Sequence, residues 1–469
     1  MRLGPAMLAG LSPAVGRFDY PRDEQAVGII HLGLGAFHRA HQATYTDDAL
    51  NAGDRDWAIC GVSLRSSYVR AQLMPQGGLF SVTERAGKSD STRIIGSVQR
   101  VLVATEQAEA VVAAIAAPTT QIVTLTVTEK GYQGSVSGGL ALAGAEIGDD
   151  LRNPEKPRTI YGFLAAALGA RRAAGLPGLT IISCDNLADN GRRLETYLSQ
   201  FLEVSDPSLR AWFDRECSCP STMVDRIVPA TTNEQIDNLQ RQLGFRDEAA
   251  VMTEPFTQWV IEDRFVGPRP RWELAGAQLV AEVKPYEDAK LRMLNGAHSA
   301  LAYLGLQEGH TFVHEAIADP KIRDLVTRLM LDEAAPTLPV TAGLEPSKYA
   351  AVLIDRFSNS ALAHRLDQIA MDGSQKLPQR WFPTLRIHQR EGRQCPAILE
   401  ALGAWIRYLH PGPRRVIDPM AESLAEIWIT KGADQIATAL FGVDGLFAKS
   451  WKASDAELEI LRKRAKTSN

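Results

Sequence analysis

Residues 27–53 read VGIIHLGLGAFHRAHQATYTDDALNAG, and this stretch decides the fold of the first half of the chain. The apolar run 27–33 predicts a buried strand, and the segment 38–53, which ends at Gly53, predicts a helix. Between the two lies a pair of glycines, Gly33 and Gly35. A strand, a glycine-rich turn and a helix in this order are typical of a loop that binds a dinucleotide.

Each glycine has a definite physical use in such a loop. Gly33 permits the tight turn, and Gly35 lets the backbone approach a pyrophosphate at the helix N-terminus. His38 stands where the third glycine of the G-x-G-x-x-G pattern would allow close packing of helix and strand. We therefore expect at His38 either a wider gap or a side chain turned toward the ligand. An ordinary tight turn is the alternative interpretation of the whole stretch.

Short β-like runs alternate with helical patterns through the first half of the chain. Further strands are predicted at 57–64, 121–129 and 179–185, and further helices at 105–118 and 190–203. This alternation predicts an α/β domain, a Rossmann-like fold with a mostly parallel sheet, which we place at residues 1–285. The later sequence predicts a mainly α-helical domain over 286–469. Its predicted helices are 286–306, 314–331, 347–359, 395–409 and 455–469.

Composition favours a small-molecule partner. The 469 residues include 51 Lys and Arg against 55 Asp and Glu, so the chain lacks the basic excess of a nucleic-acid-binding protein. The five cysteines form an odd set without a metal-ligand spacing, which predicts reduced thiols and no metal site. Without a signal-peptide pattern or a run of about 18 apolar residues, we expect a soluble cytoplasmic protein with no membrane partner, as a monomer or small homo-oligomer.

The end of the second predicted strand bears on the choice of cofactor. A dehydrogenase specific for NAD usually has an acidic residue there, which binds the ribose hydroxyls. This sequence reads SLRSS over 63–67, with Arg65 and no carboxylate. We expect NAD, with NADP also admissible, and a solvated loop arginine is the plain alternative for Arg65.

The helix predicted at 286–306 places three polar side chains among apolar neighbours. At about 100° per residue, Lys290, Asn295 and His298 lie at about 0°, 140° and 80°, within one broad side of the helix. Burying such groups without partners costs about 2 kcal/mol or more each, which calls for a ligand. Burial favours the neutral form of a lysine, so Lys290 suits a general base. Gly296, less favourable than alanine by about 1 kcal/mol in a helix, indicates a close backbone approach. A snorkelling lysine beside a core histidine is the plain alternative.

A second polar group follows the strand predicted at 179–185. Asp185 and Asn186 come just past its carboxyl end, the edge at which open α/β sheets bind ligands. Both residue types also favour helix-capping positions. A binding role and a capping role both fit the sequence, and the two residues could differ.

Taken together, these stretches resemble the long-chain mannitol dehydrogenase family of zinc-independent polyol and uronate dehydrogenases. The matching segments cover nearly the whole chain and read HLGLGAFHRAHQA, TEKGY, SCDN, MVDRIVPAT, KLRMLNGAHS and DGSQKLPQR. The family's loop has the form G-x-G-x-F-H, so His38 is no defect in it. The resemblance implies no metal and a cofactor site formed, with Arg65, by Gly33, Gly35, Phe37, His38, Arg39, Glu129 and Lys130.

The resemblance also implies the chemistry. The spaced motif Lys-x4-Asn-x2-His assigns the general base to Lys290 and the binding of the reacting oxygen to Asn295 and His298, and Asn186 completes an oxyanion-type site. The expected reaction is the NAD(P)-dependent, reversible oxidation of a secondary alcohol in a linear polyol or sugar acid. The segments GVSLRS, RFSN and QIAMDGSQKLPQR are most similar to the branch of the family that interconverts D-mannonate and D-fructuronate.

A sugar acid differs from a neutral polyol by one carboxylate, which in a closed site needs a cation or several N–H donors. The candidates within 356–380 are Arg356, His364, Arg365, Lys376 and Arg380. The resemblance places Lys376 beside the substrate, and we expect His364 and Lys376 to bind the carboxylate. Asp225 of MVDR is expected close to the substrate or in the shell of residues that supports it. Arg365 and Arg380 suit a solvated helix face equally well. Two alternatives remain: a 2-dehydrogenase of mannitol- or arabinitol-type polyols, and a nucleotide-sensing protein that binds the cofactor without turnover.

Overall fold

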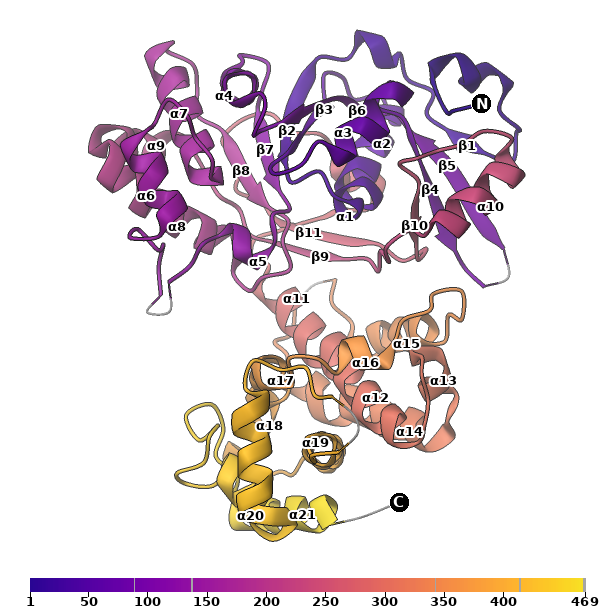
Figure 1. Ribbon diagram of the computed structural model, residues 1–469, viewed down its shortest axis with the longest axis vertical. Coiled ribbons are helices and arrows are strands. Elements are labelled where there is room, and N and C mark those ends of the chain that lie inside the picture. The colour runs from indigo at the N-terminus through magenta and orange to yellow at the C-terminus, as the bar shows by residue number, and fades with distance from the viewer. Residues whose placement is uncertain (88, 136–137, 342, 413–414, 467–469) are drawn as a thin grey trace. The chain divides into compact units, whose positions relative to one another are not determined.

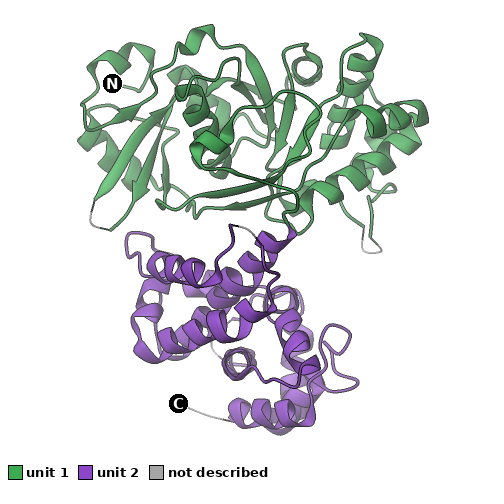
Figure 2. Ribbon diagram, turned by 180° about the vertical axis from the view of Figure 1, so that it is seen from behind, with its two compact units in different colours: residues 1–283 green, residues 284–469 purple. Residues whose placement is uncertain are grey.

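The computed structural model describes residues 1–87, 89–135, 138–341, 343–412 and 415–466. The chain divides into two compact units, residues 1–283 and residues 284–469 (Figure 2). Each unit has its own hydrophobic core. Each is therefore described by itself.

A five-stranded parallel sheet forms the centre of the first unit (Figure 1). Its strand order is β6-β3-β2-β7-β8, and all four neighbouring pairs are parallel. The strands are β2 (Val27–Leu32), β3 (Ala58–Ser63), β6 (Val98–Val103), β7 (Ile122–Leu125) and β8 (Thr180–Ser183). The chain proceeds from β2 outward to β6 and then returns to β7 on the other side of β2. This order confirms the Rossmann-like fold, and it puts the ligand-binding switch point beside β2.

The three helices predicted in the first unit are present, one of them with a correction, and the structure adds further helices, one of which begins at Thr128 within the strand predicted at 121–129. The helix predicted over 38–53 is two helices, because the backbone breaks at His41, where φ is −120° and ψ is −90°. The predictions at 105–118 and 190–203 are confirmed as α4 and α8. The helices are α1 (Ala36–Ala40), α2 (Gln42–Asn51), α3 (Tyr68–Leu73), α4 (Ala108–Ala116), α5 (Thr128–Gly131), α6 (Ala145–Arg152), α7 (Ile160–Ala173), α8 (Asn190–Ser205), α9 (Pro207–Glu216) and α10 (Asn233–Leu243).

Two smaller sheets complete the first unit. One has the order β1-β5-β4-β10 and the other β12-β11-β9. Their strands are β1 (Gly16–Arg17), β4 (Phe80–Arg85), β5 (Asp90–Ile95), β9 (Thr222–Asp225), β10 (Val251–Thr253), β11 (Gln258–Glu262) and β12 (Gln278–Val280). Strands β9 and β11 are antiparallel, and Asp225 pairs with Gln258. The short 3-10 helices are Pro5–Gly10, Arg22–Glu24, Met74–Gln76 and Trp272–Ala275.

The second unit is built from helices, which confirms the mainly α-helical second half. Two stretches are π-helical, and we name Lys290–Asn295 the first π segment and Leu329–Ala334 the second. A 3-10 turn, Ala335–Thr337, follows the second. The helices are α11 (Lys284–Ala289), α12 (Gly296–Gln307), α13 (Val313–Ala318), α14 (Pro320–Arg328), α15 (Pro346–Phe357), α16 (Leu366–Ile369), α17 (Gly373–Arg380), α18 (Phe382–Arg390), α19 (Pro396–Tyr408), α20 (Ala421–Phe441) and α21 (Asp455–Lys466).

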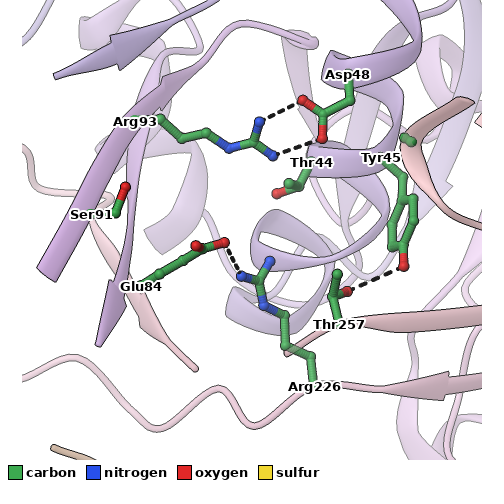
Figure 3. A pocket seen from close by; sticks show the side chains of 9 residues that line it. Thr44, Tyr45, Asp48, Glu84, Ser91, Arg93, Arg226 and Thr257 are labelled. Atoms are coloured by element: carbon green, nitrogen blue, oxygen red, sulfur yellow. Dashed lines mark hydrogen bonds and ion pairs between the residues drawn. The ribbon is translucent and has the colours of Figure 1, made fainter. Parts of the chain in front are cut away.

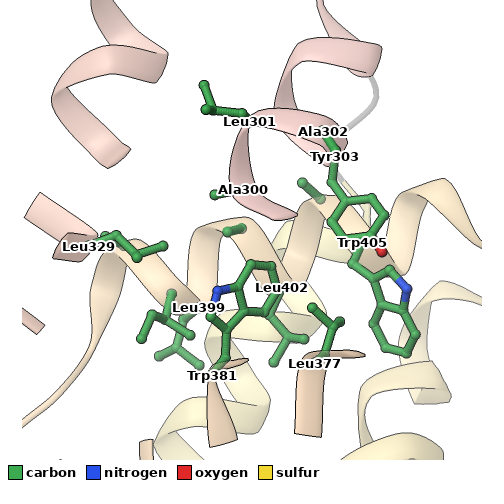
Figure 4. Close-up of a cluster of buried hydrophobic side chains, with 14 of the residues drawn as sticks. Ala300, Leu301, Ala302, Tyr303, Leu329, Leu377, Trp381, Leu399, Leu402 and Trp405 are labelled. Atoms are coloured by element: carbon green, nitrogen blue, oxygen red, sulfur yellow. The ribbon is translucent and has the colours of Figure 1, made fainter. Parts of the chain in front are cut away.

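Helix α12 lies in the core of the second unit, because every residue from Gly296 to Tyr303 is buried. A helix that is buried on all sides must be surrounded by other helices. Figure 4 shows Leu301 and Tyr303 of α12 together with Trp381 and Trp405 in this core. Among the described residues, every helix is too short or too polar to span a bilayer.

Candidate active site

Side chains on the sheet and at its edge hold the glycine loop that follows β2. Gly33 has φ +97°, and a Cβ there would lie 2.1 Å from the carbonyl oxygen of Thr126, so only glycine fits. The Thr126 hydroxyl donates to the Gly33 carbonyl at 2.8 Å, and His31 Nε2 lies 2.9 Å from the same hydroxyl. Since the Thr126 proton is used, His31 Nε2 is the donor of that second bond. The loop is therefore fixed in one conformation.

Gly35 has a different reason to be glycine. A Cβ there would meet only the Gly33 carbonyl oxygen, at 3.8 Å, so the protein leaves this space open. Gly35 precedes the first turn of α1 in an extended conformation, and no side chain caps that turn. Open space beside free backbone N–H groups fits a pyrophosphate. The residues of this loop therefore fit a dinucleotide cofactor.

His38 fills the space between α1 and the sheet. Its ring is fully buried and stacks on His31 with 3.4 Å between ring centroids and 17° between planes. Burial lowers the pKa of both rings, that of His31 to about 3, so both are neutral. The ring thus occupies the space that a glycine at this position would leave for close helix–sheet packing, and the predicted contact of His38 with the cofactor stays a prediction.

Arg39 and Phe37 lie on the same helix as His38 and contact other parts of the unit. The guanidinium of Arg39 donates to the carbonyl oxygens of Ala249 and Gly35, and burial lowers its pKa to about 10. Phe37 is half-buried and stacks on His41 at 5.1 Å. Arg39 thus ties the loop to the segment before β10. Its predicted contact with the cofactor stays a prediction.

The ends of β3 and β7 present exposed side chains. Arg65 is exposed after β3, where the Ser63 hydroxyl donates to the Ser66 carbonyl at 2.5 Å. Glu129 and Lys130 are exposed on α5, which follows β7. These residues lie at the carboxyl edge of the parallel sheet, as does the glycine loop. This is the edge at which open α/β sheets bind their ligands.

Asp185, at the end of β8, has a structural role. Its carboxylate accepts from the backbone N–H of Val127 at 3.0 Å, from that of Thr128 at 2.8 Å, and from the Tyr132 hydroxyl at 3.0 Å. Thr128 has φ +65°, an uncommon value for a β-branched residue, and its bond to Asp185 holds it there. Burial raises the pKa of Asp185. The capping interpretation thus applies to Asp185, while Asn186, the next residue, is exposed.

Asp225 is the last residue of β9 in the first unit. It is 5% exposed and pairs with Gln258 of β11. The sequence predicted that Asp225 lies near the substrate or in its supporting shell. The structure places it at the carboxyl end of β9. Its contact with substrate stays a prediction.

In the second unit, the first π segment corrects our placement of Lys290 and Asn295. A π-helix closes its hydrogen bonds five residues back, so residues five apart lie on one side, as residues four apart do in an α-helix. Lys290 and Asn295 are five apart and therefore closer in direction than the about 140° of an α-helix. Lys290 is 8% exposed. π-Helical turns are frequent at functional sites, which supports a role for this one.

Two side chains that the sequence did not single out for this purpose hold the end of the π segment. Arg380 donates to the Asn295 carbonyl at 3.1 Å and to the Ser299 hydroxyl at 2.8 Å. Trp381 Nε1 donates to the Gly296 carbonyl at 3.2 Å. A Cβ on Gly296 would lie 3.3 Å from that same indole nitrogen, which agrees with the expected close approach. Arg380 is therefore a support of the π segment and not part of a solvated face.

His298 lies one turn beyond the π segment, in contact with a second histidine. Its ring centroid is 4.8 Å from Phe357 and 5.2 Å from His364, whose ring stands at 81° to it. Burial, with His364 and Arg356 nearby, lowers the pKa of His298 well below its usual value. Within the described residues, His298 Nε2 and His364 Nδ1 have no hydrogen-bond partner. The pair therefore offers two ring nitrogens to a ligand.

The other cationic candidates differ in their surroundings. Lys376 Nζ donates to the Met371 carbonyl at 2.6 Å, and burial lowers the pKa of its ammonium group. Arg365 is exposed and pairs with Asp367 at 2.7 Å, so the solvated interpretation fits it. Lys376 Nζ also donates to the carbonyl of Ile369, the last residue of α16, at 3.4 Å, and it lies 4.0 Å from the Asp372 carboxylate. Its contact with the substrate stays a prediction.

Binding of a metal ion requires several suitable side chains placed close together. Over the described ranges, no group of three or more His, Cys, Asp and Glu is placed to hold a metal ion. The five cysteines are free thiols.

Comparison with known proteins links both units to one family. Residues 27–274 match the family model described as the mannitol dehydrogenase Rossmann domain, and residues 282–453 match that of the mannitol dehydrogenase C-terminal domain. The chain is 43% identical over 442 residues to a D-mannonate oxidoreductase of Escherichia coli (strain K12), which covers 92% of this chain and 90% of that one.

Two solved structures are similar over nearly the full length. One is Pseudomonas fluorescens mannitol 2-dehydrogenase in a ternary complex with NAD and D-mannitol, with 37% identity, a TM-score of 0.84, and coverage of 99% of this chain and 96% of that one. The other is a D-sorbitol dehydrogenase in substrate-free form, with 30% identity, a TM-score of 0.91 and the same coverage.

Proposed function

The chain belongs to the mannitol dehydrogenase family, and from this premise we propose that it oxidises D-mannonate to D-fructuronate, reversibly, at C5 and with NAD. The observation that supports this most is the first π segment, which buries Lys290 and brings Asn295 toward the same side of the helix. A buried lysine beside an amide and an imidazole is suited to remove a hydroxyl proton and to bind the oxygen that remains.

In this proposal Lys290 is the general base. Its neutral Nζ accepts the proton of the C5 hydroxyl, and in the reverse direction the ammonium returns that proton to the oxygen. The side-chain amides of Asn186 and Asn295 donate hydrogen bonds to the oxygen as negative charge develops on it. His298 is neutral because burial lowers its pKa, so it orients the oxygen by hydrogen bonding without adding charge. Bound NAD would accept the hydride from C5.

The glycine loop is the proposed site of the cofactor's pyrophosphate, since Gly35 leaves space there. The strand end that follows β3 supplies Arg65 and no carboxylate for the ribose. NAD is then bound through hydroxyls and backbone, and the arginine also admits the phosphate of NADP. A titration of NADH and NADPH binding decides between the two.

The sugar acid is proposed over the neutral polyol because of the cationic and N–H groups in the second unit. His364 offers an unpartnered ring nitrogen, and Lys376 offers an ammonium group held by the Met371 carbonyl. The Escherichia coli relative, a D-mannonate oxidoreductase, supports this choice at 43% identity. The Pseudomonas fluorescens structure with D-mannitol, at 37%, supports the alternative, a mannitol-type 2-dehydrogenase.

Steady-state kinetics with D-fructuronate, D-mannonate, fructose and mannitol test the proposal. We expect kcat/KM to be higher for D-fructuronate than for fructose, and higher for D-mannonate than for mannitol. A higher kcat/KM for fructose would reject the sugar acid and leave the role of Lys290 intact. NADH that binds but is not oxidised by any ketose or keto acid would instead favour a nucleotide-sensing protein.

A further inference from the structure

Two hydrogen bonds fasten the end of the glycine-loop helix to the strands around Asp225. Arg226, the residue after Asp225, donates from Nη1 to the Ala40 carbonyl at 2.5 Å. His41, the residue after Ala40, donates from Nε2 to the carbonyl of Gln258 at 2.9 Å. Gln258 is the partner of Asp225 in the antiparallel pair of β9 and β11. Ala40 and His41, which are adjacent at the end of α1, are thus bonded to the residue after Asp225 and to the strand partner of Asp225.

Arg226 is built into the protein as a buried junction. Its side chain is 1% exposed, and Nε and Nη2 both donate to the Glu254 carbonyl, at 3.2 and 3.0 Å. Nη2 also forms an ion pair with Glu84 of β4 at 2.6 Å, as Figure 3 shows. Burying a guanidinium is costly unless its donors are paired, and four donor contacts meet that condition here. One side chain therefore joins α1, β4 and the segment after β10.

The bond to Ala40 also explains where α1 ends. The last carbonyl groups of a helix have no partner inside it, and a cation near them is favourable. Ala40 is the last residue of α1, and the backbone breaks at His41. Because Arg226 and His41 both bond at this point, a longer helix over 36–51 would break the two contacts. The break is thus part of how the loop is placed.

We propose that Arg226 is a positioning residue that holds the cofactor loop and the strand of Asp225 as one rigid body. The inference rests on the proposed function, because it takes the loop as the cofactor site and Asp225 as a neighbour of the substrate. Arg226 acts through α1 and β9, and it touches neither ligand in this scheme. A shift of α1 would move the backbone N–H groups of the loop away from the pyrophosphate, so this joint matters first for cofactor binding.

The test compares Arg226→Gln with Arg93→Gln. Arg93 and Asp48 form the second arginine–carboxylate pair of the cavity in Figure 3, which has a volume of about 260 Å³ and is also lined by Arg226 and Glu84. Within the described residues, the Arg93 guanidinium donates its hydrogen bonds to Asp48 of α2, so its loss leaves α1 and β9 joined. Each variant removes one arginine–carboxylate pair of this cavity. If Arg226 had a purely structural role, both variants should change the Kd for NADH by the same factor.

We expect Arg226→Gln to raise the Kd for NADH, measured by fluorescence titration, about tenfold or more, the scale of one lost hydrogen bond to a charged group, and to raise KM for the sugar substrate. Saturating kcat should fall less, because Lys290, Asn295 and His298 are unchanged. Arg93→Gln should keep the wild-type Kd. If Arg226→Gln does not fold, His41→Phe serves in its place, since it keeps a ring and removes the Nε2 donor, and it should raise the Kd severalfold.

Three results would overturn the inference. The first is a wild-type Kd for NADH in folded Arg226→Gln, or in His41→Phe where that variant serves. The second is an equal rise in Arg93→Gln. The third is a wild-type protein that binds no NADH, which would also reject the proposed function. The first two leave the proposed function standing, so the two failures are distinguishable.

Discussion

At the scale of single residues, buried partners hold the loops at the carboxyl edge of the parallel sheet. Gly33 accepts the positive φ of the tight turn that follows β2. The carboxylate of Asp185 accepts hydrogen bonds from Val127 and Thr128 and so holds the turn that follows β7. The ring of His38 stacks on that of His31 beneath the glycine loop.

Lys290 provides the first prediction at this scale. Lys290→Ala should lower kcat by about 10²-fold or more, the usual scale for a positioned general base. The Kd for NADH should hardly change, because the glycine loop is untouched. The measurement is kcat across a wide pH range together with the NADH titration. Lys284→Ala is the matched control, since Lys284 is an exposed lysine paired with Asp288. Nearly full turnover of Lys290→Ala at every pH would show that another group is the base.

At the scale of elements, the spacing of apolar residues predicts that a segment is helical, but it does not predict whether the helix is of the α or the π type. The sequence predicted a regular α-helix through Lys290 and Asn295, and the structure has a π segment there. The partners that hold its end are Arg380 and Trp381, about 85 residues further along. The wider turn of a π segment displaces carbonyl groups from the α-helical ladder, and Arg380 and Trp381 bind two of the carbonyls at its end. The sequence of the π segment itself does not indicate these two partners.

Gly296 tests how closely this element is packed. A Cβ on Gly296 would lie 3.3 Å from Trp381 Nε1 and 3.5 Å from its Cδ1, so Gly296→Ala should force the indole away. Overpacking of this kind costs about 1–3 kcal/mol, which exceeds the gain in helix propensity of about 1 kcal/mol. Gly169→Ala in α7 is the control, because its nearest contact is an ordinary 3.7 Å. Denaturant unfolding should show a loss for the first variant and none for the second. A more stable Gly296→Ala would contradict the tight packing.

The second π segment predicts a pH dependence of stability. Glu333 is 3% exposed, and its carboxylate accepts from the backbone N–H groups of Ala397 and Ile398 at 2.6 and 2.8 Å. Burial raises its pKa from 4.5 to about 7. The folded state then holds this proton more tightly than the unfolded state. Its contribution to the free energy of unfolding is therefore fully present below about pH 4.5 and is lost as the pH rises to about 7.

Glu333→Gln removes the titrating group and keeps one acceptor for the start of α19. Unfolding by denaturant, measured at a series of pH values, should show that the wild type loses stability relative to this variant between about pH 4.5 and 7. Above that range the difference should be constant. Parallel curves through the range would show that Glu333 has the same proton affinity in both states.

At the scale of the whole molecule, the order of elements was the most predictable feature. Four strands of the parallel sheet and the change to helices in the second half follow from period and length alone. The two smaller sheets could not be predicted, because their strands are short and pair with distant segments. Strand β10, for example, pairs Val251 with Val82 of β4. Pairing over such distances is set by the packing of the whole unit, which a local pattern does not contain.

Metal independence is a prediction about the whole molecule. Dialysis against a strong chelator should leave activity unchanged. In the proposed function Lys290 takes the hydroxyl proton and the amides of Asn186 and Asn295 stabilise the oxygen, which are the two tasks that a catalytic zinc performs in other enzymes. A zinc-dependent alcohol dehydrogenase dialysed in parallel is the positive control and should lose activity. A large loss in this protein that added zinc restores would show that the proton and the oxygen are handled by a metal, and it would remove the roles assigned to the lysine and the two asparagines together.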